Sequence, residues 1–150
     1  MRAFTAPMQQ LGEFEDIIRK TAGNRGLLQV TGCIDSQKSH FVYCVSDKFC
    51  SQSAFGPVTL IITYNDLRAK EMYENYRFFD PEVLYFPAKD LIFFQADIHS
   101  NLLEQQRIQV LKRLVERTDS EIAGKPLTII TTIAACMNRM PSFEEWKEHI

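Results

Sequence analysis

Apolar residues in this chain gather in short runs at positions 27–31, 58–63, 83–86 and 127–132. The runs are rich in Val, Ile, Leu, Thr and aromatic residues, a composition typical of β-strands. "VTLIIT" at 58–63 and "LTIITT" at 127–132 are apolar almost throughout, and such runs predict strands buried on both faces, as in a parallel sheet. We therefore predict four strands, each of them buried.

The intervals between these runs have the spacing and the boundary residues of helices. Asn65 or Asp66 is placed to cap a helix, and Ser142 and Glu145 have the spacing of a capping box. Residues 86–100 have no clean period and predict a long loop. The predicted helices cover residues 7–21, about 38–50, 66–79 and 101–117, a short stretch after residue 132, and a stretch that begins at residue 142.

Strands that alternate with helices are typical of βαβ units, so the predicted fold class is α/β, with a parallel sheet flanked by helices. The last predicted helix carries Phe143, Trp146 and Ile150, and little of the chain is left for these side chains to pack against. We therefore expect the first piece of a longer protein. Residues 1–141 would form the first part of one domain, and residues 142–150 would begin the next.

Composition and charge narrow the class of protein. Apolar residues make up 45% and charged residues 24% of the chain, which is typical of a soluble globular protein, and the net charge of −2 gives no basic excess for nucleic acid. No run is long enough to span a membrane, and no secretory signal precedes the first helix. We therefore expect a cytoplasmic protein without a membrane partner.

The four cysteines form no C-x-x-C pair and have no histidine at zinc-ligand spacing. We interpret them as small buried thiols and expect no metal site. Cys33, beside a predicted helix N-terminus, has the alternative role of a nucleophile. His40, His99 and His149 are scattered and define no catalytic triad. The four cysteines are Cys33, Cys44, Cys50 and Cys136.

The stretch "GCIDSQKSH" nearly matches the phosphate loop G-x-x-x-x-G-K-[ST]. Lys38 and the following hydroxyl fit, but Gln37 replaces the second glycine, which would let the backbone approach the phosphates. Asp35 adds a negative charge beside them, about 4 kcal/mol per unit charge at 4 Å and an effective dielectric of 20. The positions of this degenerate phosphate loop are Gly32, Asp35, Ser36, Gln37, Lys38 and Ser39.

A nucleotide hydrolase also needs an acid that holds magnesium at the end of a buried strand. The run at 127–132 ends in threonines, and Asp66 falls where a helix cap is expected. We therefore predict no catalytic residue, no metal and no cofactor in this chain. Lys38 keeps two interpretations, a residual anion contact or a solvated first-turn lysine.

Leu91, Ile92, Phe93 and Phe94 form an apolar cluster inside the predicted loop. One interpretation is a loop that folds back onto the domain's own core. The other is an apolar contact for a neighbouring domain or a partner protein.

Several of these stretches together resemble the extreme N-terminus of the bacterial transcription-repair coupling factors. The resemblance covers about residues 28–141 and is carried by the degenerate loop, "TLIITYNDLRAKEMYENYRFF", "FPAKDL" with "DIHSNLLEQQR", and "LTIITTIAACMNRMP". It implies an ATPase-like module similar to the B subunit of the excision nuclease. The implied fold is related to the P-loop NTPases of the RecA-like helicase class, with a degenerate phosphate loop.

The resemblance implies a longer parent, a DNA translocase that displaces stalled RNA polymerase and recruits nucleotide excision repair. In that family ATP and magnesium belong to the motor, and an inserted domain, expected here from about Pro141, binds the nuclease A subunit. Residues 87–99 are too few for the damage-gripping hairpin of the B subunit. We therefore expect a non-catalytic scaffold. The alternatives are a small P-loop NTPase or kinase that tolerates Gln37, and a DNA-binding module, which the net charge disfavours.

Overall fold

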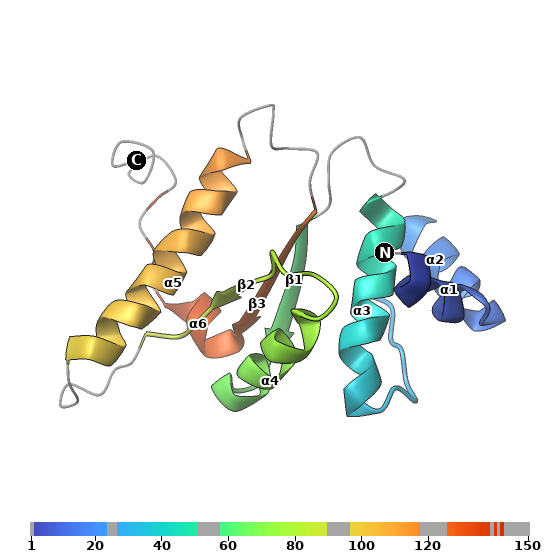
Figure 1. Cartoon of the computed structure of the whole chain (residues 1–150), viewed down its shortest axis with the longest axis horizontal. Coiled ribbons are helices and arrows are strands. Elements are labelled where there is room, and N and C mark those ends of the chain that lie inside the picture. The colour runs from blue at the N-terminus through green and yellow to red at the C-terminus, as the bar shows by residue number, and fades with distance from the viewer. Residues whose placement is uncertain are drawn as a thin grey trace.

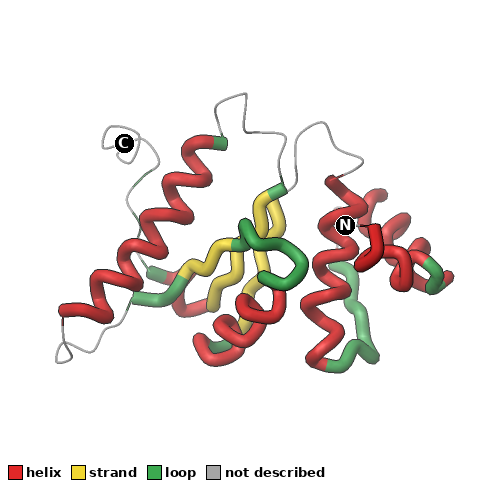
Figure 2. Tube along the Cα trace, viewed as in Figure 1, coloured by secondary structure: helices red, strands yellow, loops and turns green. Residues whose placement is uncertain are grey.

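The structure is a computed structural model, and it describes residues 2–23, 27–50, 58–89, 97–117, 126–138, 140 and 142. Six helices and three strands lie in the described ranges (Figures 1 and 2). In chain order these elements are α1 (Arg2–Gln9), α2 (Gly12–Gly23), α3 (Asp35–Cys50), β1 (Val58–Thr63), α4 (Asp66–Tyr76), β2 (Leu84–Phe86), α5 (Asp97–Glu116), β3 (Leu127–Thr132) and α6 (Ile133–Met137).

The strands form one parallel sheet in the order β1-β3-β2. β3, the last strand in the sequence, therefore lies between the other two, and Ile130 pairs with Ile61 on one side and with Tyr85 on the other. α4 connects β1 to β2, and α5 connects β2 to β3. The predicted α/β class, with a parallel sheet flanked by helices, is confirmed. The relationship to P-loop NTPases stays a prediction.

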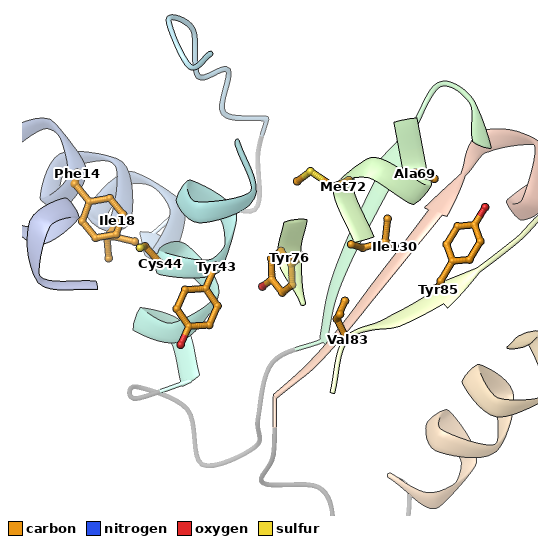
Figure 3. Packing of buried hydrophobic residues seen from close by; sticks show 10 residues of the cluster. All are labelled: Phe14, Ile18, Tyr43, Cys44, Ala69, Met72, Tyr76, Val83, Tyr85 and Ile130. Atoms are coloured by element: carbon orange, nitrogen blue, oxygen red, sulfur yellow. The ribbon is translucent and has the colours of Figure 1, made fainter. Parts of the chain in front are cut away.

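Two apolar clusters cover the two faces of the sheet. On one face, α4 packs on β3, and α3 and α2 extend the cluster outward (Figure 3); its buried members are Phe14, Ile18, Tyr43, Cys44, Ala69, Met72, Tyr76, Val83, Tyr85 and Ile130. On the other face lie α5 and α6. The buried members there are Phe86, Val110, Leu127, Ile129 and Ala135. Ile129 and Ile130 point to opposite faces because successive side chains of a strand alternate.

The two strands predicted to be buried on both faces differ in the structure. Every residue of β3 is buried, as predicted. In β1 the prediction is wrong, because the residues of one face are only half-buried, and on the other face Val58, Leu60 and Ile62 are 52%, 53% and 51% exposed. These residues pair with β3 residues of the α5 side, such as Ile129, but α5 packs over β2 and α6 over β3. That face of β1 is therefore uncovered in the described part of the chain.

The predicted strand at 27–31 is also wrong. These residues pair with no described strand, and Figure 2 draws them as a loop. Leu27 is 98% exposed.

Several helix boundaries differ from the predicted ones. The helix predicted at 7–21 is two helices, α1 and α2, because the chain turns at Leu11, whose N–H donates to the Met8 carbonyl (3.1 Å). α3 begins at Asp35 and α5 at Asp97, each earlier than expected. α4 has the predicted cap, since Asn65 Oδ1 accepts from the Arg68 N–H (2.8 Å).

Some predictions fall outside the described residues, namely the helix after Ser142 and residues 90–96 of the predicted loop, whereas residues 97–100 of that loop are helical. Within the described ranges, every helix is too short or too polar to cross a lipid bilayer.

Candidate functional site

The loop that resembles a phosphate loop is shorter than its sequence suggests. Gly32 has a φ of 86°, a left-handed conformation that glycine adopts without strain. α3 begins at Asp35, and the Gln37 N–H already donates to the Ile34 carbonyl (3.0 Å). A working phosphate loop stays non-helical up to the position of the second glycine. Here Gln37 lies in the first turn of α3, so half of the residues that would surround the phosphates are helical.

Lys38, the residue that would contact the phosphates, is held in a network of ion pairs. Its Nζ donates to Asp35 Oδ1 (2.7 Å), and Arg68 of α4 contacts the same carboxylate oxygen (2.7 Å). Arg68 in turn pairs with Glu71 (2.9 Å). Exposed ion pairs contribute only about 0–1 kcal/mol each, so the network alone does not lock the lysine in place. Its charges sum to zero, however, and leave no net attraction for a triphosphate.

The network changes the pKa values of its members in the expected directions. The hydrogen bond from Lys38, together with the charge of Arg68, lowers the pKa of the Asp35 carboxyl. The hydrogen bond to Glu71 and the nearby charge of Asp35 raise the pKa of Arg68. Asp35 therefore carries its full negative charge at neutral pH, at the position where phosphate would enter.

Ser39, the residue whose hydroxyl would bind magnesium in a working loop, faces the core instead. Its side chain is 1% exposed, and its Oγ donates to Met72 Sδ of α4 at 3.2 Å. A magnesium ion needs oxygen ligands in an octahedral arrangement with several waters, and this apolar contact offers neither. Ser39 thus acts as a packing residue between α3 and α4.

No second acid completes a magnesium site in the described ranges. Asp66, the nearest candidate in sequence, is the first residue of α4 and accepts a hydrogen bond from the Tyr85 hydroxyl (3.4 Å). The carboxyl end of β3 carries Thr132, whose Oγ1 accepts from the Ala135 N–H (3.2 Å) and caps α6. Among the residues with described side chains, no three His, Cys, Asp or Glu residues lie close enough to hold a metal ion.

Among the described cysteines and histidines, Cys44 Sγ and His40 Nε2 both contact the Phe4 carbonyl oxygen, at 3.9 Å and 2.5 Å. Cys44 is buried, and burial, with the nearby charge of Asp47, raises the pKa of its thiol to about 11, which leaves it unreactive. Cys33 is half-buried, but Cys136 is exposed, so the prediction of buried thiols is wrong for Cys136. The contact of His40 with the Phe4 carbonyl joins α3 to α1. The His40 ring also stacks on Phe79. The side chains of Cys50, His99 and His149 lie outside the described residues.

The apolar cluster Leu91–Phe94 also lies outside the described residues. The sequence missed two residues that shape the loop, Arg68 and Met72, both on α4. The pair of Asp35 with Lys38 could have been found, because helical residues three apart are neighbours. Arg68 and Met72 meet the loop only through the packing of α4 against α3, and their sequence positions gave no sign of it.

In comparisons with protein-family models, with curated proteins and with solved structures, no match to this chain was found.

Proposed function

We propose that this chain is a non-catalytic scaffold, part of the N-terminal module of a transcription-repair coupling factor. The observation that carries the proposal is the state of the loop. Lys38 lies in an ion-pair network of zero net charge, and the Ser39 hydroxyl faces Met72. These features support a chain that has the sequence of a degenerate phosphate loop without its chemistry, as the sequence resemblance implies.

In this proposal the parent protein is an ATP-dependent DNA translocase, and ATP and magnesium bind in its motor, outside this chain. The chain itself holds the following inserted domain in place, and that domain binds the A subunit of the excision nuclease. RNA polymerase and DNA contact other parts of the parent. The chain also helps to mask the repair-recruiting surface until the motor engages.

The open face of β1 supports a role in contacts between domains. Val58, Leu60 and Ile62 form an exposed apolar row along the strand, and Ile133 at the start of α6 is exposed as well. An isolated exposed apolar side chain is common, but a contiguous row marks a surface that another segment covers. A neighbouring domain of the same protein is the partner that the scaffold proposal requires.

The test is a calorimetric titration with magnesium-ATP of the whole chain and of two variants, Gln37→Gly and Lys38→Ala. We expect no heat of binding from any of them. Gln37→Gly restores the glycine of the motif, but Ser39 still faces Met72 and the charges still sum to zero. Saturable binding by the unmodified chain that Lys38→Ala abolishes would overturn the proposal. The small P-loop NTPase or kinase would then become the leading function.

A pull-down with the nuclease A subunit tests the interaction half of the proposal. This chain should retain little of the subunit, and a longer chain that includes the next domain should retain much more. Equal retention by both chains would show that the binding surface lies within these residues, contrary to the proposal.

A further inference from the structure

A groove of about 500 Å³ lies at the edge of the sheet formed by β2. Its floor is residues 81–85, and its walls come from Tyr73 and Arg77 of the α4 side and from one face of α5 that includes Gln106, Gln109 and Lys112. α4 and α5 cover opposite faces of the sheet, with β2 between them (Figure 1). A cavity that both helices line together with β2 must therefore lie at the edge of β2 that no described strand covers. We call it the β2 groove.

The backbone of Tyr85 faces this groove. The Phe86 carbonyl accepts a hydrogen bond from Thr131 Oγ1 of β3 (2.8 Å), so the polar groups of Phe86 point toward β3. Successive residues of a strand direct their N–H and C=O groups to alternate sides, and those of Tyr85 therefore point to the open edge. An open strand edge is a template for another strand. The side chain of Tyr85 is buried toward α4, so the edge itself is not blocked by it.

The positive residues of the groove differ in how closely they are paired with carboxylates. Arg77, Lys112 and Arg113 line it with two carboxylates, Glu82 and Glu116. Arg113 engages both carboxylates, Glu82 at 2.8 Å and Glu116 at 3.7 Å. Lys112 has only a 4.0 Å contact with Glu116, which Arg113 also uses. Arg77 is paired with Glu74, which lies just outside the lining (3.5 Å), so Lys112 is the lining cation with the longest ion-pair distance.

We propose that the β2 groove binds an extended acidic segment of a partner protein, which adds as a strand to β2. The open backbone of Tyr85 supplies main-chain hydrogen bonds, as in other cases of strand addition. The amides of Gln106 and Gln109 can donate to and accept from the peptide groups of the added strand. Lys112 supplies a positive charge for its carboxylates, and the groove volume falls in the range of about 300–1,000 Å³ found for binding clefts.

A nucleic acid strand fits the groove less well than a peptide. Single strands bind through bases that stack on free aromatic faces. Two aromatic residues line the groove, Tyr73 and Tyr85, and their rings pack against each other at 5.8 Å, while Tyr73 also lies under the Arg77 guanidinium at 5.4 Å. The Tyr73 ring therefore has no free face on which a base could stack, whereas the open strand edge can pair with a peptide backbone.

The experiment uses the whole chain and a fluorescein-labelled, end-capped peptide of about eight residues in which valine alternates with glutamate. We expect saturable binding below about 1 mM, with amide chemical-shift changes at Tyr85, Gln106 and Gln109 in NMR spectra. Two control peptides separate the contribution of charge from that of main-chain hydrogen bonds. One carries lysine in place of glutamate, and the other carries proline at every second position, which removes the N–H groups that strand addition needs. Both should bind at least about tenfold more weakly.

Lys112→Glu should weaken binding of the valine–glutamate peptide about tenfold, since it replaces an attraction by a repulsion. Lys70→Glu, an exposed lysine on α4 outside the groove, is the matched control and should bind as the unmodified chain does. Equal binding of the proline peptide, shifts that avoid Tyr85, or no binding up to about 1 mM would each overturn the proposal. Binding of a single-stranded oligonucleotide instead of the peptide would overturn it in favour of nucleic acid.

Discussion

β1 and β3 have nearly the same sequence and different surroundings. "VTLIIT" and "LTIITT" both consist of β-branched and aliphatic residues, and they pair with each other along their whole length. β3 has a strand on each side and helices on both faces, so every one of its residues is buried. Among the described strands, β1 has a neighbour on one side only, and its row of Val58, Leu60 and Ile62 is exposed. An apolar pattern thus reports that a face is to be buried, but not what buries it.

The largest expected difference between the two strands comes from removing an isoleucine in each. Ile130→Ala in β3 empties a fully buried site and should lower the free energy of unfolding by about 3–4 kcal/mol. Ile62→Ala in β1 is the matched control, and it should cost about 1 kcal/mol or less, because half of that side chain is already in water. Urea unfolding of both variants measures the difference.

If Ile130→Ala fails to fold, the pair Ile130→Val and Ile62→Val gives the same comparison on a smaller scale. The expected costs are about 1 kcal/mol in β3 and close to zero in β1. Equal costs at the two positions would show that the outward face of β1 is covered in solution.

The sequence was informative where local signals decide the structure. Neighbouring residues predict three features that the structure has. They are the helix cap at Asn65, the buried strand β3 and the alternation of strands with helices. The strand order β1-β3-β2 does not follow from such signals, because any buried parallel strand can neighbour any other. The segment 27–31 shows the same limit, since its apolar pattern is a local signal but a strand needs a partner elsewhere in the chain, and none of the described strands pairs with it.

In the candidate site, too, the sequence predicts the local features and not the contacts between helices. Its residues could be found from the motif, and the missing glycine at Gln37 predicted a degenerate loop. The contacts that occupy Asp35 and Ser39 are tertiary, because Arg68 and Met72 reach these residues only once α4 has packed against α3. Composition and spacing describe each element by itself, and such contacts between elements are beyond them.

Two buried tyrosines that pack around β3 and β2 should make the fold sensitive to alkali. Burial raises the pKa of Tyr76 to about 12, and burial with the nearby charge of Asp66 raises the pKa of Tyr85 to about 12. In the unfolded chain a tyrosine ionises near 10, so the unfolded state loses these protons first. Stability is therefore fully present below about pH 10 and falls as the pH rises to about 12, by roughly 2–3 kcal/mol for each tyrosine.

Urea unfolding at a series of pH values measures this loss, and Tyr76→Phe and Tyr85→Phe should each remove about half of it. A pH dependence that is unchanged in both variants would contradict the assignment to these residues. The outward face of β1 carries no ionisable group among Val58, Leu60 and Ile62, so changes there should leave the alkaline loss unaltered.

A smaller effect is expected from a buried hydroxyl of β3. Thr131 Oγ1 donates to the Phe86 carbonyl at 2.8 Å and ties the central strand to β2. Thr131→Val keeps the shape and removes this bond, and should lower the free energy of unfolding by about 1 kcal/mol. Thr59→Val in β1 removes a hydroxyl that lies 2.9 Å from Ser46 Oγ. Because Thr59 is half-buried, this change should lower the free energy of unfolding by less than Thr131→Val does. A larger loss from Thr59→Val would reverse the ranking of the two strands.

The smallest expected change in stability is at the centre of the uncovered face. Leu60→Thr keeps a residue that favours strands and replaces an exposed apolar side chain by a smaller, partly polar one. The free energy of unfolding should change by no more than about 0.5 kcal/mol, as for most surface substitutions. The fluorescence of an apolar dye bound to the folded chain should nevertheless fall, because the dye reports exposed apolar surface. A loss of more than about 2 kcal/mol would mean that Leu60 is buried, and β1 would then be as enclosed as β3.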